Sequence, residues 1–128
     1  MDIHNPHYQQ IGGEKAVRAL VDCFYDIMDR DPAASGIRKL HPANLDSSRE
    51  KLFMFLSGWL GGPQLYVEQY GHPRLRQRHM PFPIGESERD EWMHCMKLAL
   101  DQCGIEEKLK AHLTLSFFKT ADFLRNEP

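Results

Sequence analysis

Residues 71–84 read GHPRLRQRHMPFPI and form the most distinctive segment of the sequence. The segment is irregular, because a proline has no backbone N–H and cannot continue a helix. It also surrounds one imidazole with guanidinium groups, which suit carboxylates, and with apolar surface. The residues concerned are His79, Arg76 and Arg78, Met80 and Phe82, and Pro81 and Pro83.

A single imidazole beside anion donors and an apolar wall is the chemistry expected at the edge of a haem site. There a histidine nitrogen binds iron, arginine binds propionates and hydrocarbon contacts the porphyrin. Taken alone, the segment also fits a solvated basic loop that caps a helix. The chain has seven histidines, but none of the spacings typical of a zinc site, such as H-x-x-x-H or H-E-x-x-H, is present.

Apolar residues at three- and four-residue steps predict helices on both sides of this segment. Ser47 with Glu50, and Ser87 with Asp90, are typical of helix starts. Strand-like alternation and internal repeats are absent from the sequence, so the predicted fold class is all-α. The predicted elements are helices over about 14–29, 47–59, 87–103 and 105–124, and short helical turns over 37–40, 66–70 and 75–79.

The 128 residues are enough for one hydrophobic core, so we expect a single domain over residues 1–128. A net charge of −2 gives no basic surface for nucleic acid, and no apolar stretch approaches the roughly 20 residues that cross a membrane. Because the polar start carries no apolar signal segment, a cytoplasmic location is expected. Cys23, Cys95 and Cys103 are expected to be reduced thiols in the core.

Several short motifs around the histidine segment occur together in a known pattern. They are YQQIGG at 8–13, Phe24-Tyr25, GGP at 61–63, Tyr66, the segment 71–84 and ERDEWMHCM at 88–96. Together they closely resemble the truncated haemoglobins of group II, and the resemblance covers nearly the whole chain. It implies a shortened globin fold, a two-over-two helical sandwich, with haem b as the cofactor.

The resemblance also implies roles for the matching positions. His79 becomes the proximal iron ligand, and Arg78 becomes a propionate partner. Tyr66 and Lys51 match positions that reach the other propionate region. The remaining residues expected to line the haem are Ser48, Leu52, Leu75, Phe82, Trp92 and Met96.

On the distal side, the resemblance points to Tyr25 and Trp92. A tyrosine O–H and an indole N–H can both donate to dioxygen on the iron, which carries partial negative charge. Ser48 stands where many globins have the distal histidine, so an open ligand path is expected there. His41 occupies a position where the family more often has tyrosine or phenylalanine. It is either an exposed loop histidine before Pro42 or a distal imidazole that titrates near neutral pH.

These residues predict a haem protein that binds dioxygen and other diatomic ligands and releases them slowly. Two or three donors, each contributing about 0.5–1.5 kcal/mol, slow release by roughly one to three decades. We therefore expect redox or detoxification chemistry on nitric oxide or peroxide, with weak enzyme activity and a separate reductase, rather than oxygen delivery. The alternative is a haem-free all-α interaction or regulatory domain, whose loop with Arg74, Arg76 and Arg78 contacts an acidic partner.

Overall fold

The protein is helical through most of residues 6–127, which are the residues that the computed structural model describes. His4 and both ends of the expected 1–128 domain lie outside this range. No strand occurs within it, so the predicted all-α class is confirmed. The elements are α1 (His7–Ile11), α2 (Gly13–Arg30), the 3-10 helix η1 (Pro32–Ala34), α3 (Ser35–Lys39), α4 (Asp46–Trp59), α5 (Leu65–Tyr70), α6 (Leu75–His79), α7 (Glu86–Gln102) and α8 (Glu107–Phe123).

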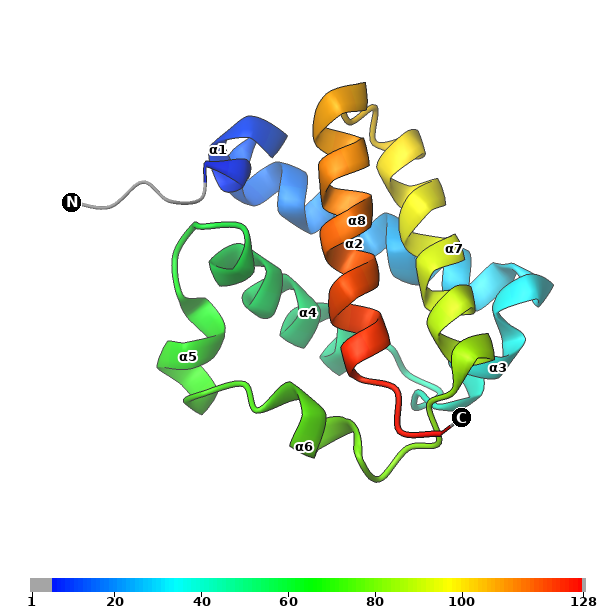
Figure 1. Cartoon of the computed structure of the whole chain (residues 1–128). Helices are drawn as coiled ribbons and strands as arrows, with labels where there is room; N and C mark the ends of the chain where they lie inside the picture. Colours follow the sequence, from blue (N-terminus) through cyan, green and yellow to red (C-terminus); the bar gives the residue numbers. More distant parts are fainter. Residues whose placement is uncertain (1–5, 128) are drawn as a thin grey trace.

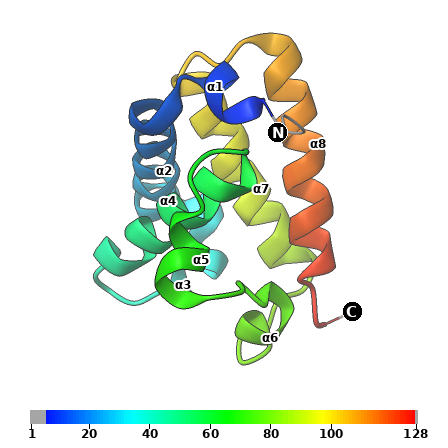
Figure 2. The same ribbon diagram turned by 90° about the vertical axis from the view of Figure 1, so that its left-hand side faces the viewer.

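The long helices form two crossed layers. Helices α7 and α8 run antiparallel in one layer, and α2 passes behind α8 with α4 beside it (Figure 1). The view turned by 90° places α2 and α8 on opposite sides of the molecule with α7 between them (Figure 2). Apolar side chains fill the space between the layers, which confirms the predicted two-over-two sandwich. The largest wholly buried side chains include Leu20, Phe24, Leu56, Met96, Leu100 and Leu113.

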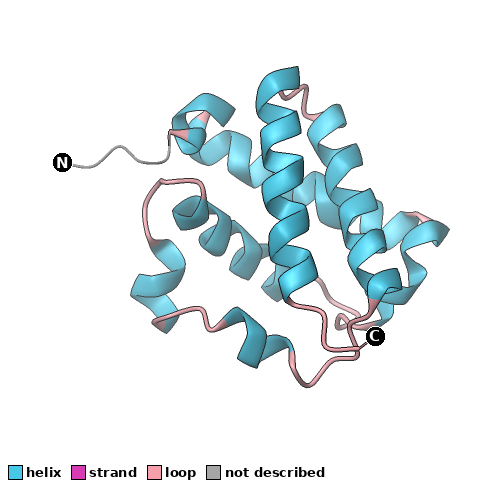
Figure 3. Ribbon diagram, in the orientation of Figure 1, coloured by secondary structure: helices cyan, strands magenta, loops and turns pink. Residues whose placement is uncertain are grey.

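Two short helices, α5 and α6, and the loops around them connect α4 to α7 (Figure 3). Their bounds match the predicted turns to within one residue. Helix α5 ends at Gly71, whose φ of 81° lies in the left-handed region that glycine adopts without strain. Helix α6 follows, and none of its residues is buried. The chain therefore carries His79 on a single turn of helix that has little core packing of its own.

The start of α4 differs from the prediction. The Arg49 N–H donates to the Leu45 carbonyl at 2.9 Å, so the helix already begins at Asp46. The predicted capping residue, Ser47, therefore lies inside the first turn, where its side chain cannot cap the helix. The Asp46 N–H instead donates to the Asn44 side-chain oxygen at 2.8 Å, so the preceding loop satisfies this end of the helix.

The start of α7 is also one residue earlier than predicted. The Gly85 N–H donates to the Glu88 carboxylate at 2.8 Å, which is the backward half of a capping box. Ser87 therefore lies within the helix, and Asp90 has no part in the cap. The predicted start was wrong by one residue, because acidic residues recur throughout this segment and only the loop conformation decides which of them caps the helix.

Helix α1 was not predicted, since five residues are too few to show a helical period. The Tyr8 N–H donates to the Leu60 carbonyl at 2.8 Å, and Ile11 is buried in the core. His7, expected in an irregular start, lies in α1 with its ring centre 4.6 Å from that of His112. Tertiary contacts with the end of α4 and with α8 therefore account for α1.

The three cysteines are free thiols, as predicted. Cys95 is completely buried in the core, whereas Cys23 and Cys103 are half-buried. The Cys23 thiol donates to the Gln102 side-chain oxygen at 3.1 Å and so connects α2 to the end of α7.

Replacing Gly62 with alanine tests the packing of α1. A Cβ at Gly62 would overlap the Tyr8 ring, and because the φ of Gly62 is not positive, the cost comes from this clash alone. We expect Gly62→Ala to lower the free energy of unfolding in urea by about 1–3 kcal/mol. In a Tyr8→Ala background the same substitution should cost almost nothing. An equal cost in both backgrounds would show that the clash is not the cause.

Candidate functional site

His79 ends α6, and its ring orientation is determined by the turn before it. Its Nδ1 lies 2.6 Å from the Leu75 carbonyl oxygen. A carbonyl can only accept, so Nδ1 carries the proton. In the neutral ring, Nε2 then has an unprotonated lone pair, which is the form that binds a metal. In the neutral ring, Nε2 is therefore the nitrogen of His79 that is able to bind a metal.

The turn that carries His79 begins with strained backbone and ends at the prolines. Arg74 has a φ of 49°, and its N–H donates to the His72 Nδ1 at 3.1 Å. This local bond stabilises a conformation that a residue with a side chain rarely adopts. After His79, the chain cannot extend the helix, because Pro81 and Pro83 lack the N–H donors that would continue it.

Arg78, Lys51 and Tyr66, for which the resemblance implied propionate contacts, lie around one pair of tyrosine rings. The Arg78 Nε donates to the Pro73 carbonyl at 2.9 Å, and its guanidinium carbon lies 5.8 Å from the centre of the Tyr66 ring. The Lys51 Nζ lies 5.8 Å from the Tyr70 ring, whose centre is 4.9 Å from that of Tyr66. Two exposed cations therefore flank a pair of tyrosines, of which the sequence reasoning identified only Tyr66.

Tyr25 and His41 are brought together by α2 and by the end of α3. Their ring centres are 5.7 Å apart in an edge-to-face arrangement. The Tyr25 side chain is 5% exposed, and burial raises the pKa of its hydroxyl, which therefore stays protonated and able to donate. The structure thus places His41 beside Tyr25, and not in an exposed loop.

The His41 ring is half-buried, and its Nδ1 lies 2.9 Å from the Ile37 carbonyl oxygen. As at His79, the carbonyl requires the proton on Nδ1, so Nε2 of the neutral ring can only accept. Burial lowers the pKa of His41 by more than the hydrogen bond to the Ile37 carbonyl raises it, and the positive charge of Arg38 lowers it further. The lowered pKa favours the neutral His41 ring, whose Nε2 is an acceptor.

Trp92 joins the same cluster through Phe24. The Phe24 ring centre is 4.9 Å from that of Trp92 and 4.9 Å from that of Tyr25. The Trp92 ring also packs 5.6 Å from Phe117 of α8. In the sequence, Phe24 stood out only as part of the Phe24-Tyr25 motif, and nothing distinguished this side chain as the one that connects two candidate site residues.

Glu91 is a second residue that the sequence reasoning missed. Its carboxylate accepts a hydrogen bond from the Ile37 N–H at 2.8 Å. The two carboxylate oxygens also lie 2.9 Å from where a Cβ of Gly36 would be, so a side chain at that position would push the carboxylate from this place. Helix α7 thereby holds α3, the helix just before His41, while the neighbouring Trp92 packs against Phe24.

On α4, Ser48 and Leu52 share one face and are half-buried, while the neighbouring Arg49 connects this helix to α2. Arg49 donates to the main-chain oxygen of Asp22 at 3.0 Å and to the Asp26 carboxylate at 2.8 Å. Its guanidinium carbon is 5.9 Å from the Tyr25 ring. Arg49 therefore holds the first turn of α4 against the helix that carries Tyr25.

The remaining predicted haem contacts lie in different environments. Leu75 is half-buried and Phe82 is 42% exposed, both on the segment around His79. Met80 beside them is 57% exposed. Met96 is wholly buried in the core and has no surface exposed. The structure thus brings Leu75 and Phe82 next to His79 but assigns Met96 to the interior of the sandwich.

Two crossed layers of helices, with a histidine on a short helix and a tyrosine, an imidazole and a tryptophan in one cluster, define a truncated globin. Comparison with known proteins leads to the same class. Residues 6–126 match the family described as bacterial-like globin, and the chain belongs to this family, within the group II truncated haemoglobins.

Similar proteins cover nearly the full length of the chain. The group 2 truncated hemoglobin YjbI of Bacillus subtilis (strain 168) is 38% identical over 123 residues, which are 96% of this chain and 90% of that protein. A cold-adapted truncated hemoglobin from the Antarctic marine bacterium Pseudoalteromonas haloplanktis TAC125 is 45% identical, with a TM-score of 0.92 over 94% of this chain and 98% of that one. The group II 2-on-2 hemoglobin from the plant pathogen Agrobacterium tumefaciens is 41% identical, with a TM-score of 0.93 over 100% of both chains.

As a globin, the chain is a haem protein that binds small diatomic ligands. Its residues fit such a cofactor, because His79 presents an unprotonated nitrogen beside exposed apolar side chains and two cations. Within residues 6–127, no three histidine, cysteine or acidic side chains gather to hold a metal ion, but haem iron needs only one such ligand because the porphyrin supplies others. No helix in this range is long and apolar enough to cross a membrane.

The lowered pKa of His41 predicts how stability depends on pH. Below its ordinary pKa of 6.5, His41 takes up a proton more readily in the unfolded chain than in the folded one. The unfolded state then binds more protons, so this contribution to stability is lost as the pH falls. As the pH falls from 7.5 to 5.5, we expect the free energy of unfolding of the wild type to decrease more than that of His41→Gln. A constant difference between the two proteins over this range would contradict the buried neutral state.

Proposed function

We propose that the chain is a haem b protein in which His79 is the protein's ligand to iron, and that it carries out redox or detoxification chemistry on diatomic ligands. The observation that supports this proposal most directly is the Nδ1–H bond from His79 to the Leu75 carbonyl. It leaves Nε2 of the neutral ring unprotonated, on a helix with no buried residue. When bound, haem supplies an iron that binds a diatomic ligand and can change its oxidation state.

The segment around His79 and the first half of α4 hold the cofactor in this proposal. The carbonyl partner makes the His79 ring a stronger donor to the metal, because partial negative charge at Nδ1–H increases the basicity of Nε2. Arg78 and Lys51 bind the two propionates beside Tyr66. The apolar and small side chains that contact the porphyrin in this proposal are Ser48, Leu52, Leu75, Phe82 and Trp92, with Met96 packed in the core.

The distal residues offer two donors and one acceptor. Tyr25 keeps its hydroxyl proton because burial raises its pKa, and the Trp92 indole can only donate. The Nε2 atom of neutral His41 carries no proton, so it accepts a hydrogen bond or a proton. Nε2 can donate only after it has been protonated. A proton acceptor beside two donors suits reduction chemistry, in which protons must move, better than simple storage.

The number of donors also favours chemistry over delivery. Each net hydrogen bond contributes about 0.5–1.5 kcal/mol, so two donors slow ligand release by roughly one to two decades or more. Slow release leaves time for a reaction with nitric oxide or peroxide. Weak peroxidase-like or nitric-oxide-consuming activity is expected, with electrons from a separate reductase, in the cytoplasm.

The haem-free alternative depended on an arginine-rich loop that contacts an acidic partner. Arg76, the central arginine, donates to the main-chain oxygens of Phe123 and Arg125 within the protein. The Arg78 side chain is held by the Pro73 carbonyl. The loop is therefore organised by internal contacts, and we do not propose this alternative further.

Replacing His79 with glycine tests the proposed iron ligand. We expect the haem-loaded wild type to have the visible spectrum of a histidine-ligated haem in its ferric, reduced and carbon-monoxide forms. His79→Gly should lose that spectrum and regain it with added imidazole, because the vacated position then admits a free ligand. His112→Ala, at an exposed histidine of α8, is the control. If His79→Gly keeps the wild-type spectrum without imidazole, another residue holds the iron.

Removal of single distal donors tests slow release. We expect Tyr25→Phe and Trp92→Phe each to accelerate dioxygen release from the reduced haem-loaded protein by about 2- to 12-fold, the factor that one net hydrogen bond represents. Tyr8→Phe, which removes a hydroxyl from α1, should leave the rate unchanged. The measurement is stopped-flow displacement of dioxygen by carbon monoxide. Release from the wild type as fast as from either variant would rule out donation by that side chain.

A further inference from the structure

The end of α6 has a hydrogen-bonding problem that its own sequence creates. In a continued helix, the His79 carbonyl would accept from the N–H of residue 83, but Pro83 has none. The Phe82 N–H donates to this carbonyl at 3.0 Å and satisfies only one of its two lone pairs. The second lone pair of this carbonyl is therefore free to accept from a donor elsewhere in the chain.

Asn126, which is 47 positions later in the sequence than His79, supplies this donor. Its side-chain Nδ2 donates to the His79 carbonyl at 3.3 Å and to the Phe82 carbonyl at 2.8 Å. Its Oδ1 accepts from the Ile84 N–H at 2.9 Å, and its own N–H donates to the Ile84 carbonyl at 2.9 Å. The amide thus bonds with both of its ends to residues 79–84, and only an amide side chain of this length offers donors and an acceptor in this arrangement.

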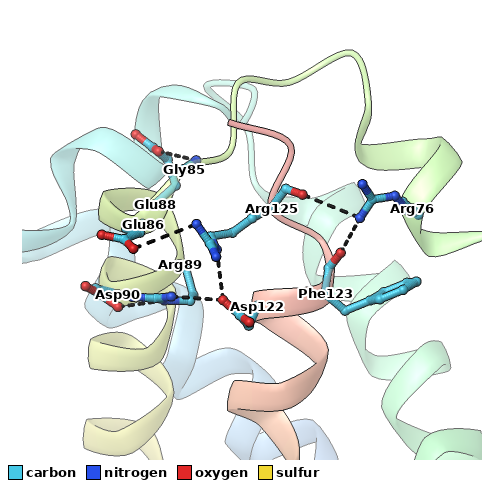
Figure 4. A network of polar contacts seen from close by, with 9 residues as sticks. All are labelled: Arg76, Gly85, Glu86, Glu88, Arg89, Asp90, Asp122, Phe123 and Arg125. Carbon is cyan, nitrogen blue, oxygen red and sulfur yellow. Dashed lines mark hydrogen bonds and ion pairs between the residues drawn. The ribbon is translucent and has the colours of Figure 1, made fainter. Parts of the chain in front are cut away.

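Arg76 makes a second contact between α6 and residues 123–126, the segment at the end of α8 that contains Asn126. Its guanidinium donates to the Phe123 carbonyl at 2.6 Å and lies 5.4 Å from the Phe123 ring (Figure 4). Arg76 was interpreted from the sequence as an arginine for propionates, and the structure instead uses it within the protein. The sequence could not distinguish it from Arg78, because both precede His79 within one helical turn.

The segment that receives these bonds is itself fixed to α7. Asp122 accepts from the Arg89 guanidinium at 2.9 Å and from the Arg125 Nε at 2.8 Å, and the Arg125 guanidinium lies 3.8 Å from the Glu86 carboxylate (Figure 4). These ion pairs are partly exposed, and each contributes little to stability by itself. Together they fix where the 123–126 segment begins relative to the long helices.

We propose that Asn126 is a positioning residue for His79: by bonding to the His79 and Phe82 carbonyls, it holds the backbone from which the imidazole approaches the iron. This inference rests on the proposed function of His79. The Leu75 carbonyl orients the ring, and Asn126 holds the backbone behind it. Hydrogen bonds therefore determine both the orientation of the ring and the position of Nε2.

Amide hydrogen exchange of the protein without haem tests the proposal independently of the cofactor. Asn126→Ala removes all three side-chain bonds, whereas Asn126→Asp keeps the shape and the acceptor for Ile84 but places a carboxylate oxygen against two carbonyls. We expect exchange at the Met80 and Phe82 amides to accelerate about tenfold in both variants, and at the Ile84 amide in Asn126→Ala, with α2 and α7 unchanged. Glu127→Gln, at the exposed next residue, is the control. Exchange within twofold of the wild type, or equal acceleration in α2 and α7, overturns the proposal.

The haem-loaded protein provides the second readout. We expect haem transfer to an excess of an apoglobin to be about tenfold faster in Asn126→Asp than in the wild type and in Glu127→Gln. The iron–histidine stretching band of the reduced protein should also shift, because the imidazole is held less rigidly. Unchanged transfer and an unchanged band overturn the positioning role. If the wild type shows no such band, the proposed function of His79 fails instead, and the exchange experiment still decides whether Asn126 holds the segment.

Discussion

The hydrogen bond from the His79 Nδ1–H to the Leu75 carbonyl is the interaction on which the proposed site depends. It selects the tautomer, sets the plane of the ring and leaves Nε2 as the only nitrogen with a free lone pair. The bond exists only if residues 75–79 form a complete helical turn. Every contact that stabilises this turn therefore contributes to the site. These contacts include the bond from the Arg74 N–H to His72 at the start of the turn and the bond from Asn126 at its end.

That turn receives little help from the hydrophobic core, because none of its residues is buried. Hydrogen bonds to residues 123–126, which are distant in sequence, hold the turn instead. Arg76 bonds to the carbonyl of Phe123, and Asn126 replaces the N–H that Pro83 lacks. Prolines thus end the helix next to His79, and the segment after α8 supplies the hydrogen bonds that those prolines removed.

The opposite side of the proposed site is held by α7. Glu91 binds the main chain of α3, the helix just before His41, while Trp92 packs on Phe24 beside Tyr25. A change in the position of α7 would therefore affect the three distal candidates together. The edge-to-face contact between Tyr25 and His41 places a protonated hydroxyl next to an imidazole whose bare nitrogen can only accept. Donation and acceptance are thus divided between neighbouring side chains.

The predicted helices were largely correct, because the apolar period of α2, α4, α7 and α8 is a local property of the sequence. The errors arose where several residues satisfy the same local rule. Ser47 and Ser87 were plausible caps, yet the loops before them place the helix starts one residue earlier. Helix α1 escaped prediction because only the contacts of Tyr8 and Ile11 with distant helices form it.

The sequence by itself determined the all-α class and the segment that carries His79 and, through the resemblance, predicted which residues form the site. Only the tertiary structure decided how those residues are used. It separated Arg78, which lies over Tyr66, from Arg76, which bonds to the 123–126 segment, and it placed His41 beside Tyr25. The physical reason is that helical period and proline act over a few residues, whereas a hydrogen bond such as that of Asn126 to His79 joins atoms that only folding brings together.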